Sequence, residues 1–320
     1  MRPEMEISPA HRNLMLMVYT ITFLIGFPAN MVAFFSLIQK MRRRATPNDV
    51  LLFSLTTSDL IFLFVLPCKI KEASDLMKWN LPYFLCTLTN SIFYATIYNS
   101  TLFLTAISVD RYLGVAFPIM YKLKRRPLYA MVASILIWVI TMAHISIVVI
   151  VQFNAPQMEL DSCFQNFTQE HMQILMPLRL EIFLVLFCVP FFICCFCYIN
   201  FVWILSQRPN INPKKRLRAI GLSLGTLLVF TVCFAPYNLS HLVGFIQWES
   251  PSWRLDALLS SAINATLDPI IFYFSSSALR GTFKHLLRSL VERVLGLCGC
   301  FKALYSRTTQ QAPMTTFQQD

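Results

Sequence analysis

Seven long stretches of mainly apolar residues follow one another along this chain, separated by shorter polar segments. Each stretch is long enough to cross a hydrocarbon core about 30 Å thick. Backbone N–H and C=O groups must pair within such a stretch, so each one is predicted to be a helix. The pattern therefore predicts an all-α membrane protein with a seven-transmembrane helix bundle over residues 13–275. The predicted spans are 13–38, 49–70, 84–116, 128–151, 174–205, 214–247 and 253–275.

Composition and charge distribution agree with this interpretation. Hydrophobic residues make up 56% of the sequence, charged residues only 13%, and the mean hydropathy is +0.57, which is unlike a soluble domain. Lysine and arginine are concentrated after the first, third, fifth and seventh spans, whereas residues 152–173 contain none. By the positive-inside rule, residues 1–12 are extracellular and the tail is cytoplasmic. The net charge of +11 then reflects topology and contact with membrane lipid, so nucleic-acid binding is not expected.

The tail after the last span has two parts. Apolar and basic residues recur at helical spacing over residues 276–295, which predicts an amphipathic helix on the cytoplasmic membrane surface. Residues 296–320 are largely polar toward their end and are predicted to be disordered. Cys298 and Cys300 are candidates for palmitoylation, because they follow a helix that lies against the membrane.

Two signals mark the outer side of the protein. Asn166 begins an Asn-Phe-Thr motif in the external segment between the fourth and fifth spans, which makes it a candidate for glycosylation. Cys86 and Cys163 are the two cysteines on the outer side. That compartment is oxidising, so we expect a disulfide that pins the external segment over the third span.

Every span also carries a polar residue, a proline or an aromatic residue that apolar packing does not require. Each has an ordinary explanation when taken singly: a proline kink, a hydrogen bond between helices, an interfacial aromatic ring or an ion pair at a helix end. Charged groups inside a membrane are costly, however, and therefore indicate a function. In chain order the residues are Asn30, Asp59, Asp110-Arg111-Tyr112, Trp138, Pro190, Tyr198, Pro236, Asn264 and Asp268-Pro269.

Taken together and in this order, these residues resemble those of the rhodopsin-like family of G-protein-coupled receptors. The resemblance implies that Asp110 holds Arg111 at rest and that activation turns Arg111 toward Tyr198 and a heterotrimeric G-protein. The family usually has an acidic residue at the foot of the sixth span, where this chain reads Lys214-Lys215-Arg216. The switch residues implied by the resemblance are Asp110, Arg111, Tyr112, Tyr198, Pro236, Asp268 and Pro269.

The same resemblance implies an allosteric sodium ion in the middle of the bundle, held by Asp59, Ser100 and Asp268. Asp268 stands where the family usually has asparagine. A second carboxylate facing Asp59 either strengthens the binding of the cation or holds a proton itself. No other cofactor and no metal site is expected, because most of the cysteines lie in apolar spans, where cysteine behaves as a small hydrophobic residue.

Positive charge near the outer ends of the last three spans indicates an anionic ligand. Arg179, Arg254 and His241 are predicted to face one outer cavity. Two arginines held close together at low dielectric repel each other, so an anion between them is stabilising, and the planar guanidinium suits a carboxylate. The alternative is that each arginine reaches water or pairs locally. The local partners would be Glu181 or Glu170 for Arg179, and Asp256 or Glu249 for Arg254.

Four segments of the chain resemble a narrower family, the free fatty acid receptors, and above all their members for short-chain acids. These segments are residues 111–118, 176–181, 236–244 and 272–277. The resemblance implies that the carboxylate is bound by Arg179, Arg254, His241 and Tyr237. Further candidates for the ligand pocket are Tyr94, Tyr98, His144 and Gln152.

We therefore expect a multi-pass receptor of the plasma membrane that senses short-chain fatty acids such as acetate, propionate and butyrate. Its expected partners are heterotrimeric G-proteins, and arrestins and receptor kinases in addition. The alternatives are a receptor for longer fatty acids or another small carboxylate, and a small-acid transporter. Transporters tend to contain internal repeats, and the two halves of this sequence are not similar. An enzyme is not expected, because the sequence shows no nucleophile with an associated base.

Overall fold

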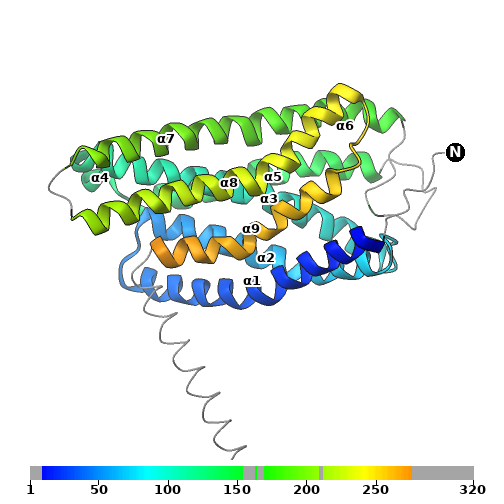
Figure 1. Cartoon of the computed structure of the whole chain (residues 1–320), viewed down its shortest axis with the longest axis horizontal. Coiled ribbons are helices and arrows are strands. Elements are labelled where there is room, and N and C mark those ends of the chain that lie inside the picture. The colour runs from blue at the N-terminus through cyan, green and yellow to red at the C-terminus, as the bar shows by residue number, and fades with distance from the viewer. Residues whose placement is uncertain (1–8, 154–162, 164–168, 209–211, 276–320) are drawn as a thin grey trace, which may run out of the picture.

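The computed structural model describes residues 9–153, 163, 169–208 and 212–275. Within these ranges the chain forms helices that run side by side along one long axis (Figure 1). The elements are α1 (Pro9–Arg44), α2 (Pro47–Ser74), α3 (Tyr83–Ala116), α4 (Pro118–Lys124), α5 (Pro127–Phe153), α6 (Gln169–Ile182), η1 (Phe183–Cys188), α7 (Val189–Ser206), α8 (Pro213–Gln247) and α9 (Arg254–Ser275).

The helical membrane bundle predicted from hydropathy is confirmed. The seven predicted spans correspond to α1, α2, α3, α5, the continuous run of α6, η1 and α7, then α8 and α9. Six helical segments of the described chain are long and apolar enough to cross a membrane by length and composition. The predicted amphipathic helix, Cys298, Cys300 and Asn166 lie outside the described residues.

The central helix of the bundle is α3. It packs against α2, α5, α7 and α8, while α9 closes the bundle by packing against both α8 and α1. Polar side chains of α3 such as Asn99 and Ser108 are therefore buried. Large apolar side chains on the outward faces, among them Phe64, Phe192 and Leu228, are exposed. Such faces are compatible with lipid tails, which are as apolar as the side chains themselves.

Asn30 explains one of the unusual polar positions of the sequence. Its Nδ2 donates to the carbonyl oxygen of Ala265 at 2.7 Å and to that of Gly26 at 3.0 Å, which ties α1 to α9. Gly26 permits this close approach. A Cβ atom on Gly26 would lie 3.2 Å from a methyl carbon of Leu63 and 3.3 Å from Oγ1 of Thr266, so three helices meet where the glycine has no side chain.

The fifth span differs from the regular helix that hydropathy predicts. Its middle is η1, a six-residue π-helix that ends just before Pro190. Proline has no N–H to donate, and its ring clashes with the carbonyl group four residues earlier, here Leu186. The wider π turn moves that carbonyl away from the ring. Pro236 and Pro269, in contrast, lie inside α8 and α9 without such a segment.

The polar segment after the third span is partly helical, whereas the spans predicted from the sequence leave residues 117–127 outside any helix. Pro118 occupies the first turn of α4, where its missing N–H would be unpaired in any case. Ile119, Met120 and Leu123 of α4 are exposed, while Tyr121 turns toward the bundle and donates to Asp110 of α3. This short helix is missed because seven residues are too few for a clear hydropathy signal.

Candidate functional site

Arg254, the first residue of α9, lies at the centre of a polar cluster at the outer end of the bundle. Its Nη2 donates to the hydroxyl oxygen of Tyr237 at 2.9 Å. Its Nη1 lies 3.2 Å from Nδ1 of His241 and donates to Oγ of Ser240 at 3.1 Å. The guanidinium carbon also lies 4.8 Å from the centre of the Tyr237 ring. The three α8 residues share one helix face, because they are spaced three and four residues apart.

The hydrogen bonds of this cluster determine the tautomer of His241. A guanidinium group can only donate, so Nδ1 of His241 accepts and Nε2 carries the ring proton. Nε2 then donates to the hydroxyl oxygen of Tyr98 at 2.9 Å. The hydroxyl oxygens of Tyr98 and Tyr237 both act as acceptors here. In the described part of the chain, neither hydroxyl proton has an acceptor, so both can be donated to a ligand.

Arg179 of α6 is the second guanidinium group of the site. Its Nη1 donates to Oγ of Ser250 at 2.9 Å. It lies close enough to Arg254 for the two like charges to repel each other. Within the described residues, no ion pair joins either arginine to an acidic side chain.

Two of the acidic residues that could have paired with the arginines interact with histidines. Glu181 interacts with His144, whose Nε2 lies 3.1 Å from Oε1 of the carboxylate. Asp256 interacts with Nδ1 of His11 at 2.9 Å. The structure thus places His144 in a contact between α5 and α6. Gln152 lies near the end of α5, and its side chain is outside the described part of the structure.

Two tyrosines of α3 complete the wall of the outer site. The ring of Tyr94 stacks on that of Tyr237, with centroids 6.2 Å apart and an angle of 15° between the rings. Tyr98 lies one turn further along α3 and is buried. The structure therefore brings together six of the predicted ligand residues, which come from four helices: Tyr94, Tyr98, Arg179, Tyr237, His241 and Arg254.

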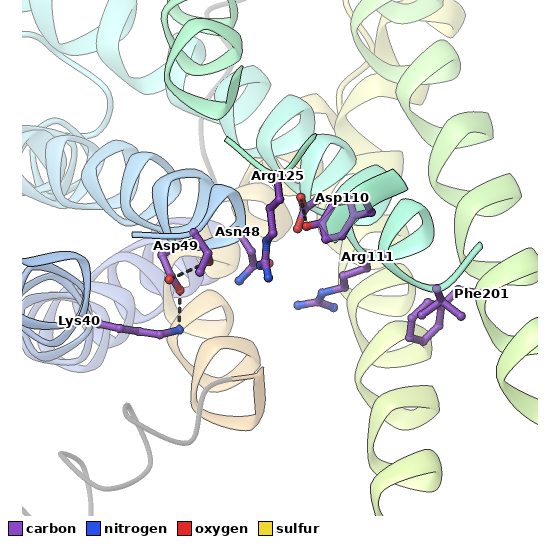
Figure 2. Close-up of a pocket in the computed structure, with 11 residues that line it drawn as sticks. Lys40, Asn48, Asp49, Asp110, Arg111, Arg125 and Phe201 are labelled. Carbon is purple, nitrogen blue, oxygen red and sulfur yellow. Dashed lines mark hydrogen bonds and ion pairs between the residues drawn. The ribbon is translucent and has the colours of Figure 1, made fainter. Parts of the chain in front are cut away.

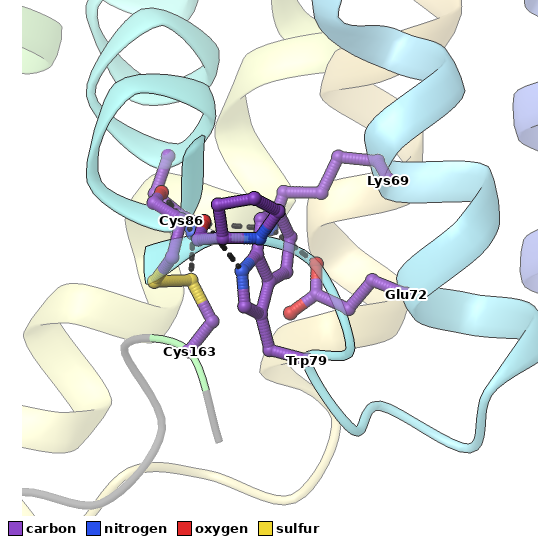
Figure 3. The surroundings of a disulfide bond; sticks show 7 residues. Lys69, Glu72, Trp79, Cys86 and Cys163 are labelled. Carbon is purple, nitrogen blue, oxygen red and sulfur yellow. Dashed lines mark hydrogen bonds and ion pairs between the residues drawn. A yellow bond between two sulfur atoms is a disulfide. The ribbon is translucent and has the colours of Figure 1, made fainter. Parts of the chain in front are cut away.

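The predicted disulfide between Cys86 and Cys163 is present, and a buried polar chain lies against it (Figure 3). Nδ2 of Asn90 donates to Sγ of Cys163 at 2.7 Å and to the carbonyl oxygen of Cys86 at 3.1 Å. Nζ of Lys69 donates to Oδ1 of Asn90 and to Oε2 of Glu72, both at 2.7 Å. The sequence interpretation missed this chain, although a lysine and a glutamate three residues apart at the end of an apolar span are a detectable signal.

Asp59 and Asp268 lie next to each other in the middle of the bundle, and both are buried. Nδ2 of Asn264 donates to Oδ2 of Asp268 at 2.8 Å. Within the described residues, Oδ2 of Asp59 and Oδ1 of Asp268 are buried without a hydrogen-bond partner. A cavity of about 10 Å³, which Ser100 also lines, adjoins Asp59. Two adjacent buried carboxylates share either a cation or a proton. The sodium ion therefore stays a prediction, with these two oxygens as its candidate ligands.

The inner end of α3 carries the Asp110-Arg111-Tyr112 motif. Asp110 accepts a hydrogen bond from the hydroxyl of Tyr121 at 2.5 Å, a partner that the sequence did not indicate. Burial and the adjacent carboxylate raise the pKa of Tyr121, so its hydroxyl remains protonated and donates. Tyr112 packs edge-on against Phe196 of α7, with ring centroids 5.7 Å apart.

The other switch residues lie near this inner end or along the last two helices. Tyr198 is buried on α7 and lies within electrostatic range of Arg111. Near Pro236, the hydroxyl groups of Ser260 and Ser261 in α9 both donate to the carbonyl oxygen of Cys233, at 3.0 and 2.9 Å. These bonds hold α8 and α9 together at the point where proline interrupts the hydrogen bonding of α8.

Comparison with known proteins agrees with this arrangement. Residues 14–272 match the family described as "7 transmembrane receptor (rhodopsin family)". The chain is 45% identical over 295 residues to free fatty acid receptor 2 of Mus musculus, covering 89% of each protein. It is 43% identical over 279 residues to free fatty acid receptor 3 of the same species, covering 86% of this chain and 87% of the relative. The chain therefore belongs to the rhodopsin family of seven-transmembrane receptors, which are multi-pass proteins of the plasma membrane.

Proposed function

We propose that this protein is a receptor for short-chain carboxylic acids, whose carboxylate binds between Arg179 and Arg254. The observation that carries the proposal is the pair of neighbouring guanidinium groups that has no acidic partner in the described part of the chain. A carboxylate at this point relieves the repulsion and accepts charge-assisted hydrogen bonds. The relatives named free fatty acid receptors 2 and 3 support this choice of ligand.

Neutral donors are proposed to complete the site. The hydroxyl protons of Tyr98 and Tyr237 are available to the second carboxylate oxygen, because both hydroxyl oxygens already accept hydrogen bonds. His241 stays neutral and links Tyr98 to Arg254, so it orients the donors without adding a third positive charge. Removing the imidazole would release both Tyr98 and Arg254 from their present orientations.

The small size of a short-chain acid limits how tightly the receptor can bind it, and this limit is compatible with a metabolite sensor. An acid with about four to six heavy atoms, at a ceiling of about −1.5 kcal/mol per atom, gains no more than about −6 to −9 kcal/mol. Dissociation constants are therefore no lower than about 0.3 to 40 µM. Weak binding of this kind suits a ligand that is present at high concentration.

The proposed signal runs from the outer site to the inner end of α3. A carboxylate that bridges Arg179 and Arg254 and contacts Tyr237 draws the outer ends of α6, α8 and α9 together. The interruptions at Pro236 and Pro269 let α8 and α9 bend, and the inner end of α8 moves outward. Arg111, with Tyr112 and Tyr198 around it, then contacts a heterotrimeric G-protein. Binding shifts the equilibrium only as far as the ligand prefers the active arrangement.

The decisive experiment removes each arginine separately. In Arg179→Ala and Arg254→Ala, the propionate concentration for half-maximal G-protein activation should rise about thirtyfold or more, because truncating one partner of a buried charge pair costs at least about 2 kcal/mol. Lys78→Ala removes an exposed cation from the same outer side and should respond like the wild type. Cell-surface amounts are measured for every variant. Full responses of both arginine variants would exclude the carboxylate site.

Two further measurements test the alternatives: one varies the chain length of the acid, and the other tests whether the protein transports the acid. Activation by a series of acids from acetate to decanoate distinguishes a short-chain receptor from one for longer fatty acids. Uptake of labelled propionate into vesicles that contain the purified protein tests transport, and we expect none above that of empty vesicles.

A further inference from the structure

A second site lies at the opposite end of the bundle from the carboxylate site. A cavity of about 430 Å³ is bounded by residues of α1, α2, α3, α4 and α7 and by the short segments between α1 and α2 and after α4. Such a volume is within the range of ligand pockets in proteins. Figure 2 shows Lys40, Arg111 and Arg125 approaching this space from three sides, with Asn48 beside them.

The charges that line the cavity do not balance. Three cationic side chains, Lys40, Arg111 and Arg125, face it together with two carboxylates, Asp49 and Asp110. Each carboxylate already accepts hydrogen bonds within the protein. Oδ1 of Asp49 accepts from Lys40 at 2.5 Å and its Oδ2 from Thr46 at 2.7 Å, and Asp110 accepts from Tyr121 at 2.5 Å. One positive charge remains in excess, which matches an anion of single charge.

Arg125 is the cation best placed to take that anion. Its guanidinium carbon lies 5.1 Å from the centre of the Tyr121 ring, so the ring supports it from one side. Tyr121 in turn is anchored by its bond to Asp110. The planar guanidinium is thus held at the cavity with donors left for phosphate oxygens, which it can contact in a bidentate manner.

The surroundings of Arg125 place it at the level of lipid headgroups. On one side of it, Ile119, Met120 and Leu123 of α4 are exposed apolar residues. On the other side, Leu128 and Tyr129 begin the membrane-facing surface of α5 and are exposed as well. Exposed apolar side chains on both sides of a basic residue are typical of a segment that lies in the membrane interface. Basic pockets at this depth on the cytoplasmic side recognise anionic headgroups.

The residues that line the cavity argue against the carboxyl-terminal segment of a G-protein as its main occupant. Within the described chain, no residue of α8 or α9 lines the cavity. The G-protein is proposed above to bind when α8 moves, whereas this cavity exists without such movement and is flanked by the exposed apolar residues of α4 and α5. We infer that it binds the headgroup of an anionic phospholipid of the inner leaflet, one with a net charge of −1, and that Arg125 is the principal cation for its phosphate.

The test measures lipid association with the full-length receptor in phosphatidylcholine vesicles, using spin-labelled phosphatidylserine and spin-labelled phosphatidylcholine as probes. The wild type should immobilise the serine lipid in preference to the choline lipid. In Arg125→Gln that preference should fall about fivefold, the effect of one basic residue near an anionic membrane surface. Arg126→Gln is the matched control, because it removes the same charge from the neighbouring residue, which does not line the cavity, and should leave the preference unchanged.

A second variant protects the test against misfolding. Asn48→Asp adds a negative charge to the cavity wall in the first turn of α2, where the helix dipole favours an acid. It should remove the preference for phosphatidylserine while the receptor unfolds at the wild-type temperature. The lipid readout needs no agonist, so it is independent of the carboxylate site.

Three outcomes would overturn the inference. The first is a wild-type receptor without any preference between the two labelled lipids. The second is an equal loss in Arg125→Gln and Arg126→Gln, which would mean general surface charge. The third is displacement of the labelled lipid by excess inorganic phosphate or by a peptide that reproduces the carboxyl-terminal residues of a G-protein α polypeptide. That displacement would assign the cavity to a soluble anion or to the G-protein.

Discussion

The buried ion pair between Lys69 and Glu72 allows a quantitative prediction. The two residues are only 7% and 2% exposed, and Oε2 of Glu72 accepts from Nζ of Lys69 at 2.7 Å. In Glu72→Leu, the ammonium group keeps its bond to Asn90 and its contact with the Phe93 ring but loses its counter-charge. Breaking a buried pair by removing one partner costs about 3 to 5 kcal/mol, because the remaining charge is left without compensation in a region of low dielectric constant.

The double variant Lys69→Met/Glu72→Leu separates this explanation from a simple loss of packing. Replacing both members of a buried pair by apolar residues of similar volume is often neutral or stabilising. We therefore expect the double variant to recover most of the stability that Glu72→Leu loses. The free energy of unfolding is measured by titration with sodium dodecyl sulfate in mixed micelles, followed by tryptophan fluorescence.

A matched control is available two residues from Lys69. Lys71 forms an ion pair with Asp75 at 2.9 Å, but 55% of the Lys71 side chain is exposed. Pairs of this kind contribute little to stability, so Lys71→Met should leave the unfolding transition unchanged. The reasoning is refuted if Glu72→Leu is as stable as the wild type, or if the double variant is as unstable as the single one.

Two further predictions concern the middle of the bundle. Gly26→Val should lower the free energy of unfolding by about 1 to 3 kcal/mol through overpacking, because even a Cβ atom would lie 3.2 Å from Leu63. Gly221→Val, where a Cβ atom would meet nothing within 4 Å, is the control and should have little effect. Replacing choline by sodium should raise the melting temperature of the wild type, since a bound ion stabilises the folded state. In Asp268→Asn this rise should be smaller, and an equal rise would argue against a sodium ion between Asp268 and Asp59.

Some of the site was visible in the sequence because the side chains themselves are unusual for a membrane. Arg179, Arg254 and Asp110 stand out against apolar neighbours, and each charge needs a partner or a ligand. What the sequence did not indicate is which partner each residue takes. Asp110 binds Tyr121, which lies on a separate short helix, and His144 binds Glu181 of α6.

The sequence by itself determined the seven membrane-spanning segments, their order, their orientation and the outer disulfide, but not the π-helix η1 or the short helix α4. Hydropathy and the positions of lysine and arginine are properties of single segments. They decide whether each segment inserts into the membrane and in which direction. Only the tertiary structure decided the contacts. The tautomer of His241, the buried chain from Glu72 to Cys163 and the basic cavity at Arg125 all depend on distances between helices that are far apart in the chain. Such distances follow from packing of the whole bundle, which local patterns do not encode.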